Sequence, residues 1–220
     1  FVSRPMEDII KEAEMIAKKG IKEIIVIAQD TTKYGIDIYG KMMLPELLQK
    51  ISEIDGIKWI RFLYAYPESI TDELIQTVKN NDKICNYFDI PIQHISNSVL
   101  KRMNRKSTAE EIENLIEKIK KEIPEVVLRT SLIVGFPGET EQDFEKLHNF
   151  VAKAKFDKLG VFKYSKEDGT PAARLPEQIH YKTKEKRHNK IMELAQKISR
   201  EKLEEKIGKE YEVLIENKTF

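Results

Sequence analysis

One stretch decides the fold class of this chain, and it reads Val126-Val127-Leu128-Arg129-Thr130-Ser131-Leu132-Ile133-Val134-Gly135-Phe136-Pro137-Gly138-Glu139-Thr140. Its first nine residues are rich in β-branched and aliphatic side chains, which predicts a strand. Gly135 and Gly138 then permit a turn that brings the backbone close to a ligand. Thr140 and Asp143 have the spacing of a capping box, so a helix is expected to begin after Thr140. A strand that runs through a glycine turn into a capped helix is typical of α/β proteins.

The same alternation of strand and helix continues from this stretch in both directions. Further strands are predicted at 24–28, 59–65, 87–92 and 159–164. Helices are predicted at 6–20, 44–54, 71–78, 108–121 and 141–154, and Ser107 and Glu110 have the capping-box spacing at the start of the fourth. Buried strands that alternate with amphipathic helices imply right-handed crossovers and a mainly parallel sheet, closed or open.

The last part of the chain differs from the rest in composition, because it is rich in charged residues. A long, charge-rich helix is predicted at 182–207, with a narrow apolar stripe formed by Ile191, Leu194, Ala195 and Ile198. We interpret it as a solvated helix on the flank of the fold rather than a binding surface. After Gly208, residues 211–215 have the pattern of a strand that begins a new unit.

Length, composition and charge limit the classes of protein open to this chain. Its 220 residues suffice for one large domain or two small ones. Because Cys85 is the one cysteine, the chain has no internal disulfide and no cysteine-based metal site, which is typical of a reducing compartment. With no apolar run of about 18 residues and no charged-then-apolar leader, we expect a cytoplasmic protein without a membrane partner. The net charge of +1 does not by itself indicate a nucleic-acid partner.

The candidate site consists of residues that follow the predicted strands, because ligands of parallel α/β folds lie beyond the carboxyl ends of the strands. Residues 29–35 offer an amide, a carboxylate and hydroxyl groups that can hold an amino-acid-like or ribose group, although such loops often only cap the next helix. Gln93 follows the third strand. His94 has no visible carboxylate partner, and we interpret it as a structural residue rather than a catalytic acid or base.

The last two strand ends point to a bound cofactor. The turn at 135–139 lacks the lysine and the spacing of a P-loop, so a nucleoside triphosphate site is not expected. Phe162 and Tyr164 can stack on an adenine or pack in the core. The sequence contains no nucleophile with a base, no H-E-x-x-H helix and no paired-carboxylate motif, which indicates that the chemistry comes from a cofactor.

Five short segments of the chain share their order with a known family. They are 28–35, 91–96, 99–105, 133–140 and Tyr164-Ser165. Together they resemble the barrel domain of the radical S-adenosylmethionine (SAM) methylthiotransferases. The tRNA-modifying branch of that family typically reads Gln-Asn-Val-Asn and Tyr-Ser-Pro-Arg-Pro-Gly-Thr in the first and last segments. This chain reads Gln29-Asp30-Thr31-Thr32 and Tyr164-Ser165-Lys166-Glu167-Asp168-Gly169-Thr170, and it is similar to the branch that methylthiolates an aspartate of a small-subunit ribosomal protein.

The resemblance implies a fold, cofactors and partners. The fold is a partial TIM-like (β/α) barrel over 1–208 whose first strand is missing, followed at 209–220 by the start of a small β-domain, the TRAM domain. The cofactors are SAM and, in the full-length protein, two [4Fe-4S] clusters, of which one cleaves SAM reductively and the other takes part in sulfur delivery. The partners are a small-subunit ribosomal protein, a reductant such as a flavodoxin or ferredoxin, and ribosomal RNA.

The resemblance also implies, by position, nine residues that bind SAM. Gln29 and Asp30 are expected near its methionine end, and Gln93, Arg129 and Ser131 near its ribose or carboxylate. Gly135 and Glu139, at the two ends of the glycine turn, are expected to shape the floor under the cofactor, and Phe162 and Tyr164 to supply the edge for the adenine. For Arg129, pairing with a buried carboxylate of the protein is an equally good interpretation.

The chain departs from the family in its metal ligands. A radical SAM cluster is held by three thiolates spaced C-x-x-x-C-x-x-C, and this chain has no such motif. The resemblance implies that these cysteines lie within about two dozen residues upstream of Phe1. Cys85 is interpreted as a small core residue, and the chain alone is expected to be inactive.

Two other functions stay open at this point. One is a tRNA-adenosine methylthiotransferase of the same family. The other is a cofactor-free α/β module that docks on ribosomal RNA or protein through the basic run 101–106 and the C-terminal helix, although a solvated helix start is the simpler interpretation of that run.

Overall fold

The computed structural model describes residues 2–215, in which helices alternate with parallel strands. The strands are β1 (Glu23–Val26), β2 (Trp59–Phe62), β3 (Tyr87–Asp89), β4 (Val127–Val134) and β5 (Lys158–Lys163). The α-helices are α1 (Met6–Lys18), α2 (Ile36–Tyr39), α3 (Leu44–Ser52), α4 (Asp72–Lys79), α5 (Asn97–Arg102), α6 (Ala109–Glu122), α7 (Glu141–Ala154) and α8 (Tyr181–Glu204). The predicted alternation is confirmed. The short helices α2 and α5 are not predicted, because so few residues show no helical period.

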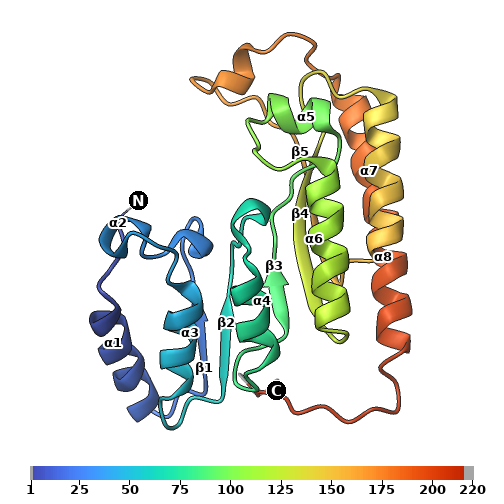
Figure 1. Cartoon of the computed structure of the whole chain (residues 1–220). Coiled ribbons are helices and arrows are strands. Elements are labelled where there is room, and N and C mark those ends of the chain that lie inside the picture. The colour runs from blue at the N-terminus through green and yellow to red at the C-terminus, as the bar shows by residue number, and fades with distance from the viewer. Residues whose placement is uncertain (1, 216–220) are drawn as a thin grey trace.

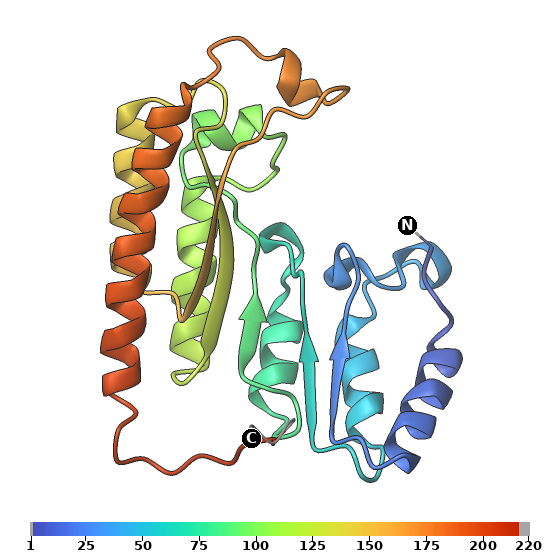
Figure 2. The same cartoon turned by 180° about the vertical axis from the view of Figure 1, so that it is seen from behind.

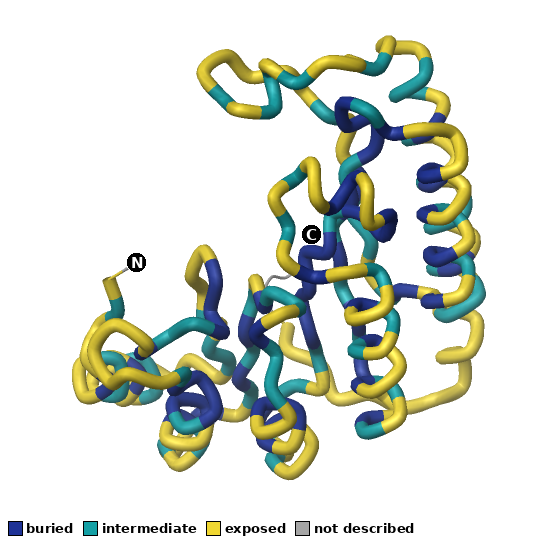
Figure 3. The backbone as a smooth tube through the Cα atoms, turned by 45° about the horizontal axis from the view of Figure 1, so that its top comes forward, coloured by how far each residue is buried: buried dark blue, intermediate teal, exposed yellow. Residues whose placement is uncertain are grey.

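The strands follow one another in chain order as a curved parallel arrangement with the helices along one side (Figure 1; Figure 2). β1 pairs with β2, and β4 lies between β3 and β5. A bridge from Ile60 to Ile84 connects the two parts. Figure 3 shows the helices around the outside and buried strand residues within. The expected partial (β/α) barrel is therefore confirmed for the described residues.

The alternation of side chains along β4 separates the two faces of the sheet. Leu128, Thr130, Leu132 and Val134 are buried, whereas the residues between them are only partly buried. Successive side chains of a strand point to opposite faces, so Arg129, Ser131 and Ile133 share the face that the helices do not cover. This uncovered face carries two of the residues that the sequence analysis assigned to the cofactor.

The helices are held by apolar faces and by capping boxes. Ile112, Ile116 and Ile119 of α6 are buried, and each contributes about 1.5–3 kcal/mol by its burial. The capping box of α6 is formed by Thr108 and Glu111, one residue later than the predicted pair. Thr108 has the extended backbone of an N-cap and its hydroxyl accepts from the Glu111 N–H at 3.3 Å, so the structure moves the helix start by one residue.

The prediction for 211–215 is wrong, because these residues form no strand in the structure. α8 ends at Glu204, three residues before the predicted end, and the chain continues to residue 215 without a further element. The rest of the proposed β-domain, 216–220, lies outside the described residues. No helix in the described part of the chain is both long and apolar enough to cross a membrane.

Candidate functional site

Two residues that follow β2 and β3 have a strained backbone. Tyr64 and Gln93 have φ angles of 60° and 68°, in the left-handed region that residues other than glycine rarely adopt. At Gln93 the neighbouring strand enforces this conformation, since its N–H donates to the Ser131 carbonyl and its carbonyl accepts from the Ile133 N–H, both at 2.9 Å. Such strain costs about 1–3 kcal/mol per residue and clusters at functional sites. The edge formed by the carboxyl ends of the strands is therefore the candidate site.

A charged pair joins β3 and β4 at this edge. Asp89 and Arg129 are opposite each other in the strand register, and Arg129 Nη1 donates to Asp89 Oδ1 at 2.7 Å. Burial favours a lower pKa for Arg129, but the hydrogen bond and the charge of Asp89 outweigh it and raise the pKa above its ordinary value. The Arg129 side chain is still 40% exposed. Arg129 therefore pairs with a buried carboxylate, which was one of its two predicted roles. Its exposed part also presents hydrogen-bond donors to the uncovered face.

Sequence reasoning missed Asp89. The signal that could have found it is an acidic residue within a predicted strand, at a position opposite the arginine of the next strand. Asp89 is 1% exposed, so its carboxylate serves to orient Arg129 rather than to contact a ligand.

In the loop after β1, the carboxylate of Asp30 points into the protein. Asp30 is 2% exposed, accepts a hydrogen bond from the Thr32 hydroxyl and forms an ion pair with Lys33 Nζ at 2.7 Å. The hydrogen bond to Asp30 raises the pKa of Lys33. Asp30 therefore shapes this loop, whereas Gln29 beside it is exposed.

The end of β5 places an exposed aromatic ring on the uncovered face. Phe162 lies opposite Ile133 in the register and is 59% exposed. Its ring lies against Gly160, where a Cβ would sit 3.5 Å from the nearest ring carbon. Among the described strands β5 pairs with β4 alone, so its outer backbone edge is open. Tyr164 instead packs edge to face on Phe136 of the glycine turn, with ring centroids 5.0 Å apart.

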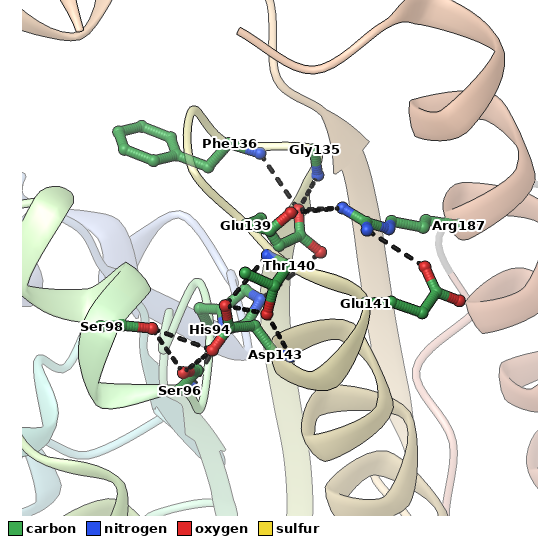
Figure 4. Close-up of polar contacts among 10 residues, drawn as sticks. All are labelled: His94, Ser96, Ser98, Gly135, Phe136, Glu139, Thr140, Glu141, Asp143 and Arg187. Atoms are coloured by element: carbon green, nitrogen blue, oxygen red, sulfur yellow. Dashed lines mark hydrogen bonds and ion pairs between the residues drawn. The ribbon is translucent and has the colours of Figure 1, made fainter. Parts of the chain in front are cut away.

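Glu139 organises the glycine turn between β4 and α7 (Figure 4). Its buried carboxylate accepts hydrogen bonds from the backbone N–H groups of Gly135 and Phe136, the latter at 3.1 Å. Arg187 of α8 lies behind it, with Nη1 3.5 Å from Glu139 Oε2 and also 3.0 Å from the Glu139 carbonyl oxygen, to which it donates. Glu139 therefore fixes the shape of the turn and does not itself face the open edge.

His94, next to Gln93, lies near a buried carboxylate but forms no hydrogen bond with it. Its Nε2 lies 3.7 Å from Glu139 Oε1, and its Nδ1 accepts from the Ser96 N–H at 3.0 Å. Because Nδ1 acts as an acceptor, the proton of the neutral ring is assigned to Nε2, toward Glu139. The sequence pattern does not reveal this pair, because the two residues belong to different strand-to-helix loops.

Below the turn, Asp143 ties the start of α7 to the loop before α5. Its carboxylate accepts hydrogen bonds from the Ser96 hydroxyl, from Ser98 at 2.9 Å and from the hydroxyl and N–H of Thr140 at 2.6 and 2.9 Å. Burial favours a higher pKa for Asp143, but these hydrogen bonds outweigh it and hold the pKa well below its ordinary value.

We expect Asp143→Asn to destabilise the protein in a pH-dependent way. Because the folded state lowers the pKa of Asp143, its stabilising contribution is complete above the ordinary value of 3.8 and is lost as the pH falls toward the folded-state pKa. Unfolding midpoints of the wild type and the variant, measured from pH 7 to pH 2, should therefore converge below about pH 4. Glu145→Gln, on the exposed face of the same helix, is the matched control, and a difference for Asp143→Asn that stays constant with pH would contradict the expectation.

A parallel partial barrel with polar side chains at the carboxyl ends of its strands is an architecture of cofactor-dependent enzymes. In fold it is similar to the radical S-adenosylmethionine methyltransferase TsrM from Kitasatospora setae, solved with cobalamin and a [4Fe-4S] cluster bound, at a TM-score of 0.58 and 16% identity over 73% of this chain and 31% of that one. The family model of the radical SAM superfamily matches residues 1–151, and the chain belongs to that superfamily.

The chain is also similar to proteins described as "Ribosomal protein uS12 methylthiotransferase RimO". The chain is 68% identical to the protein of Alkaliphilus oremlandii and 64% identical to that of Clostridium botulinum strain Hall. These matches cover 100% and 98% of this chain, but 50% and 48% of the relatives. The chain thus spans about half the length of the curated relatives it matches.

The family implies SAM and a [4Fe-4S] cluster as cofactors, and the residues present fit only the first. The exposed ring of Phe162, the open edge of β5 and the donors of Gln93, Ser131 and Arg129 suit an adenine, a ribose and a carboxylate. The described residues contain no group of three side chains that could hold a metal ion. Burial raises the pKa of the Cys85 thiol, which disfavours the thiolate that iron requires. The side chains of the described residues therefore do not fit a [4Fe-4S] cluster.

Proposed function

We propose that this chain is the SAM-binding barrel of an enzyme that adds a methylthio group to the β-carbon of an aspartate in a small-subunit ribosomal protein. The observation that carries the proposal is 68% identity over the full chain to a relative described as a uS12 methylthiotransferase. The alternative of a tRNA substrate is less well supported, because the relatives named above share the ribosomal-protein description.

In this function the residues of the chain bind and orient SAM, which when bound supplies a methyl group and can be cleaved reductively to activate a carbon–hydrogen bond. Arg129, oriented by Asp89, pairs with the carboxylate or ribose of SAM. Gln93 and Ser131 donate beside it, and Gln29 contacts the methionine end. Phe162 stacks on the adenine, whose edge pairs with the backbone of β5. Asp30 and Glu139 hold the loops that carry these contacts.

The cluster ligands, the second cluster and the reductant belong to the rest of the full-length protein and its partners. The three cysteine thiolates of a radical SAM cluster would come from residues outside this chain. A flavodoxin or ferredoxin would supply electrons. A substrate in the small ribosomal subunit supports a cytoplasmic location for the enzyme, with ribosomal RNA as a further proposed contact.

A cofactor-free docking module is less well supported by the structure. In the basic run 101–106, Arg102 pairs with Glu177 at 2.7 Å, and Arg105 donates to the Pro91 carbonyl at 2.8 Å. The Arg105 guanidinium also lies 4.8 Å from the centre of the Tyr66 ring. Two of the four cations of the basic run therefore already contact groups of this protein.

The decisive experiment is a methylthiolation assay of the full-length protein, with its clusters reconstituted, on the small-subunit ribosomal protein and on tRNA. We expect mass spectrometry to show a methylthio group on an aspartate of the ribosomal protein and none on tRNA. Modified tRNA with unmodified ribosomal protein would overturn the assignment of the substrate.

Phe162→Ala is expected to weaken SAM binding by about fivefold to 150-fold, because stacking on a base contributes about 1–3 kcal/mol. The unfolding midpoint should change little, since the side chain is 59% exposed. Calorimetric titration of the full-length protein with SAM measures the dissociation constant. Leu203→Ala, at an equally exposed residue of α8, is the matched control. Equal affinities of the two variants would remove Phe162 from the proposed site.

A further inference from the structure

Three buried ionisable side chains meet behind the glycine turn and come from three separate parts of the chain (Figure 4). His94 belongs to the loop after β3, Glu139 to the turn after β4, and Arg187 to α8. Their exposed fractions are 0%, 2% and 5%. Burying such groups is costly unless they are paired, and replacing a buried ionic cluster by apolar side chains often costs no stability. A contribution to stability alone therefore does not account for this cluster.

The geometry of the cluster links the two halves of the proposed SAM site. One oxygen of Glu139 accepts from the Gly135 and Phe136 N–H groups, while its other oxygen lies 3.7 Å from His94 Nε2. His94 directly follows Gln93 in the sequence, and the backbone of Gln93 is strained. The carboxylate thus stands between the strand end that carries Gln93 and the turn that begins at Gly135.

Helix α8 closes the cluster from outside. Arg187 donates to the Glu139 carbonyl and lies 3.1 Å from Glu141. One turn earlier on the helix, Lys184 Nζ donates to the Tyr164 carbonyl at 2.9 Å, and the stem of Lys184 packs on Gly135. Two cationic residues of α8 therefore hold the turn and the end of β5, although α8 itself does not reach the uncovered face.

We propose that His94, Glu139 and Arg187 act as one positioning unit that sets the spacing between Gln93 and the glycine turn, so that α8 forms part of the SAM site. The proposal rests on the proposed function, because it requires that SAM bind at this edge. SAM would contact both loops at once. A displacement of about 1 Å between the groups of such a site can lower the rate of the reaction by up to about 100-fold. The three residues touch neither SAM nor substrate, so they position rather than catalyse.

The first test replaces the guanidinium and keeps the apolar stem. We expect Arg187→Met in the full-length protein with its clusters reconstituted to raise the dissociation constant for SAM about tenfold by calorimetry. Arg200→Met, at an exposed position of the same helix, is the matched control and should stay within about twofold of the wild type. Wild-type affinity of a folded Arg187→Met protein would overturn the proposal.

The second test separates positioning from folding with two variants of His94, each of which keeps the hydrogen-bonding role of only one ring nitrogen. His94→Gln retains a donor where Nε2 faces Glu139, whereas His94→Asn retains an acceptor where Nδ1 faces the Ser96 N–H. We expect the Gln variant to stay within about twofold of wild-type SAM affinity and the Asn variant to bind about tenfold more weakly. The unfolding midpoints should fall in both variants alike. Equal affinities of the two variants, or affinities that simply follow the midpoints, would overturn the proposal.

These outcomes distinguish the proposal from the function on which it rests. A wild-type protein that binds no SAM refutes the proposed function and the positioning unit with it. A wild type that binds SAM, with variants that bind equally well, refutes the positioning unit alone. If Arg187→Met does not fold, the two His94 variants decide the question.

Discussion

Replacing Glu139 with alanine is expected to lower the free energy of unfolding by about 3–5 kcal/mol, because it removes the buried acid beside Arg187 and leaves the exposed Glu141 as the acidic partner of that buried charge. The N–H groups of Gly135 and Phe136 also lose their acceptor. Each buried donor left without a partner costs about 1–3 kcal/mol, so the turn rearranges rather than keep both unsatisfied. Urea unfolding followed by circular dichroism measures the change.

The control for this effect is the second acid that Arg187 contacts. Glu141 Oε2 lies 3.1 Å from Arg187 Nη2, but the Glu141 side chain is 58% exposed, so Glu141→Ala should change stability little. In a background that already carries Arg187→Met, the cost of Glu139→Ala should shrink by about 1–3 kcal/mol. Additive costs, or a small effect of Glu139→Ala alone, would show that the buried pair does not hold the turn.

The fold could be predicted from the sequence because each element shows its own period. The strand 126–134 and the helix 141–154 were bounded to within one residue, since an unbroken apolar run and a capping box mark them. The strands predicted at 59–65 and 87–92 are shorter in the structure. Beyond Phe62 and Asp89 the chain turns through Tyr64 and Gln93, whose left-handed backbone no pattern of apolar residues reveals.

The site was predicted in part, because topology alone brings the carboxyl ends of parallel strands to one edge. This rule placed Gln93, Arg129 and Phe162 at that edge, but it does not say which polar side chains point inward. Asp30 and Glu139 point inward, since each has a partner within a few residues or on a distant helix. Such partners depend on tertiary packing, so the sequence around Asp30 or Glu139 shows no periodic pattern that would reveal them.

Arg187 is an exception, because its position along α8 does indicate that it is buried. It lies four residues before Ile191 and so falls on the same face as the apolar stripe that ends at Ile198. All three are buried residues of α8. A cation on the apolar face of a charge-rich helix indicates a buried anionic partner, which here is Glu139. Helix α8 does pack on the flank of the fold, against β5 and α7, and the buried Arg187 is a feature of its N-terminal half that the interpretation did not include.

Gly135→Ala is expected to lower the free energy of unfolding by about 2–4 kcal/mol, from two causes that add at one position. Gly135 has a φ of 73°, which disfavours any side chain. A Cβ at this position would lie 2.3 Å from Cγ and 3.1 Å from Cβ of Lys184. The Cβ of Lys184 is fixed by the backbone of α8, and its Cγ can move aside only by a side-chain rotation that breaks the hydrogen bond of Lys184 to the Tyr164 carbonyl.

Two other glycines of the same backbone conformation separate these causes. Gly169 has a φ of 85° and no atom within 4 Å of a Cβ, so Gly169→Ala should show only the backbone cost of about 1–2 kcal/mol. At Gly138 the Cβ would meet the guanidinium of Arg102, the end of a flexible side chain that can rotate away. Unfolding free energies should therefore fall most for Gly135, less for Gly138 and least for Gly169. Equal losses at the three positions would mean that backbone conformation alone matters and that α8 does not press on the turn.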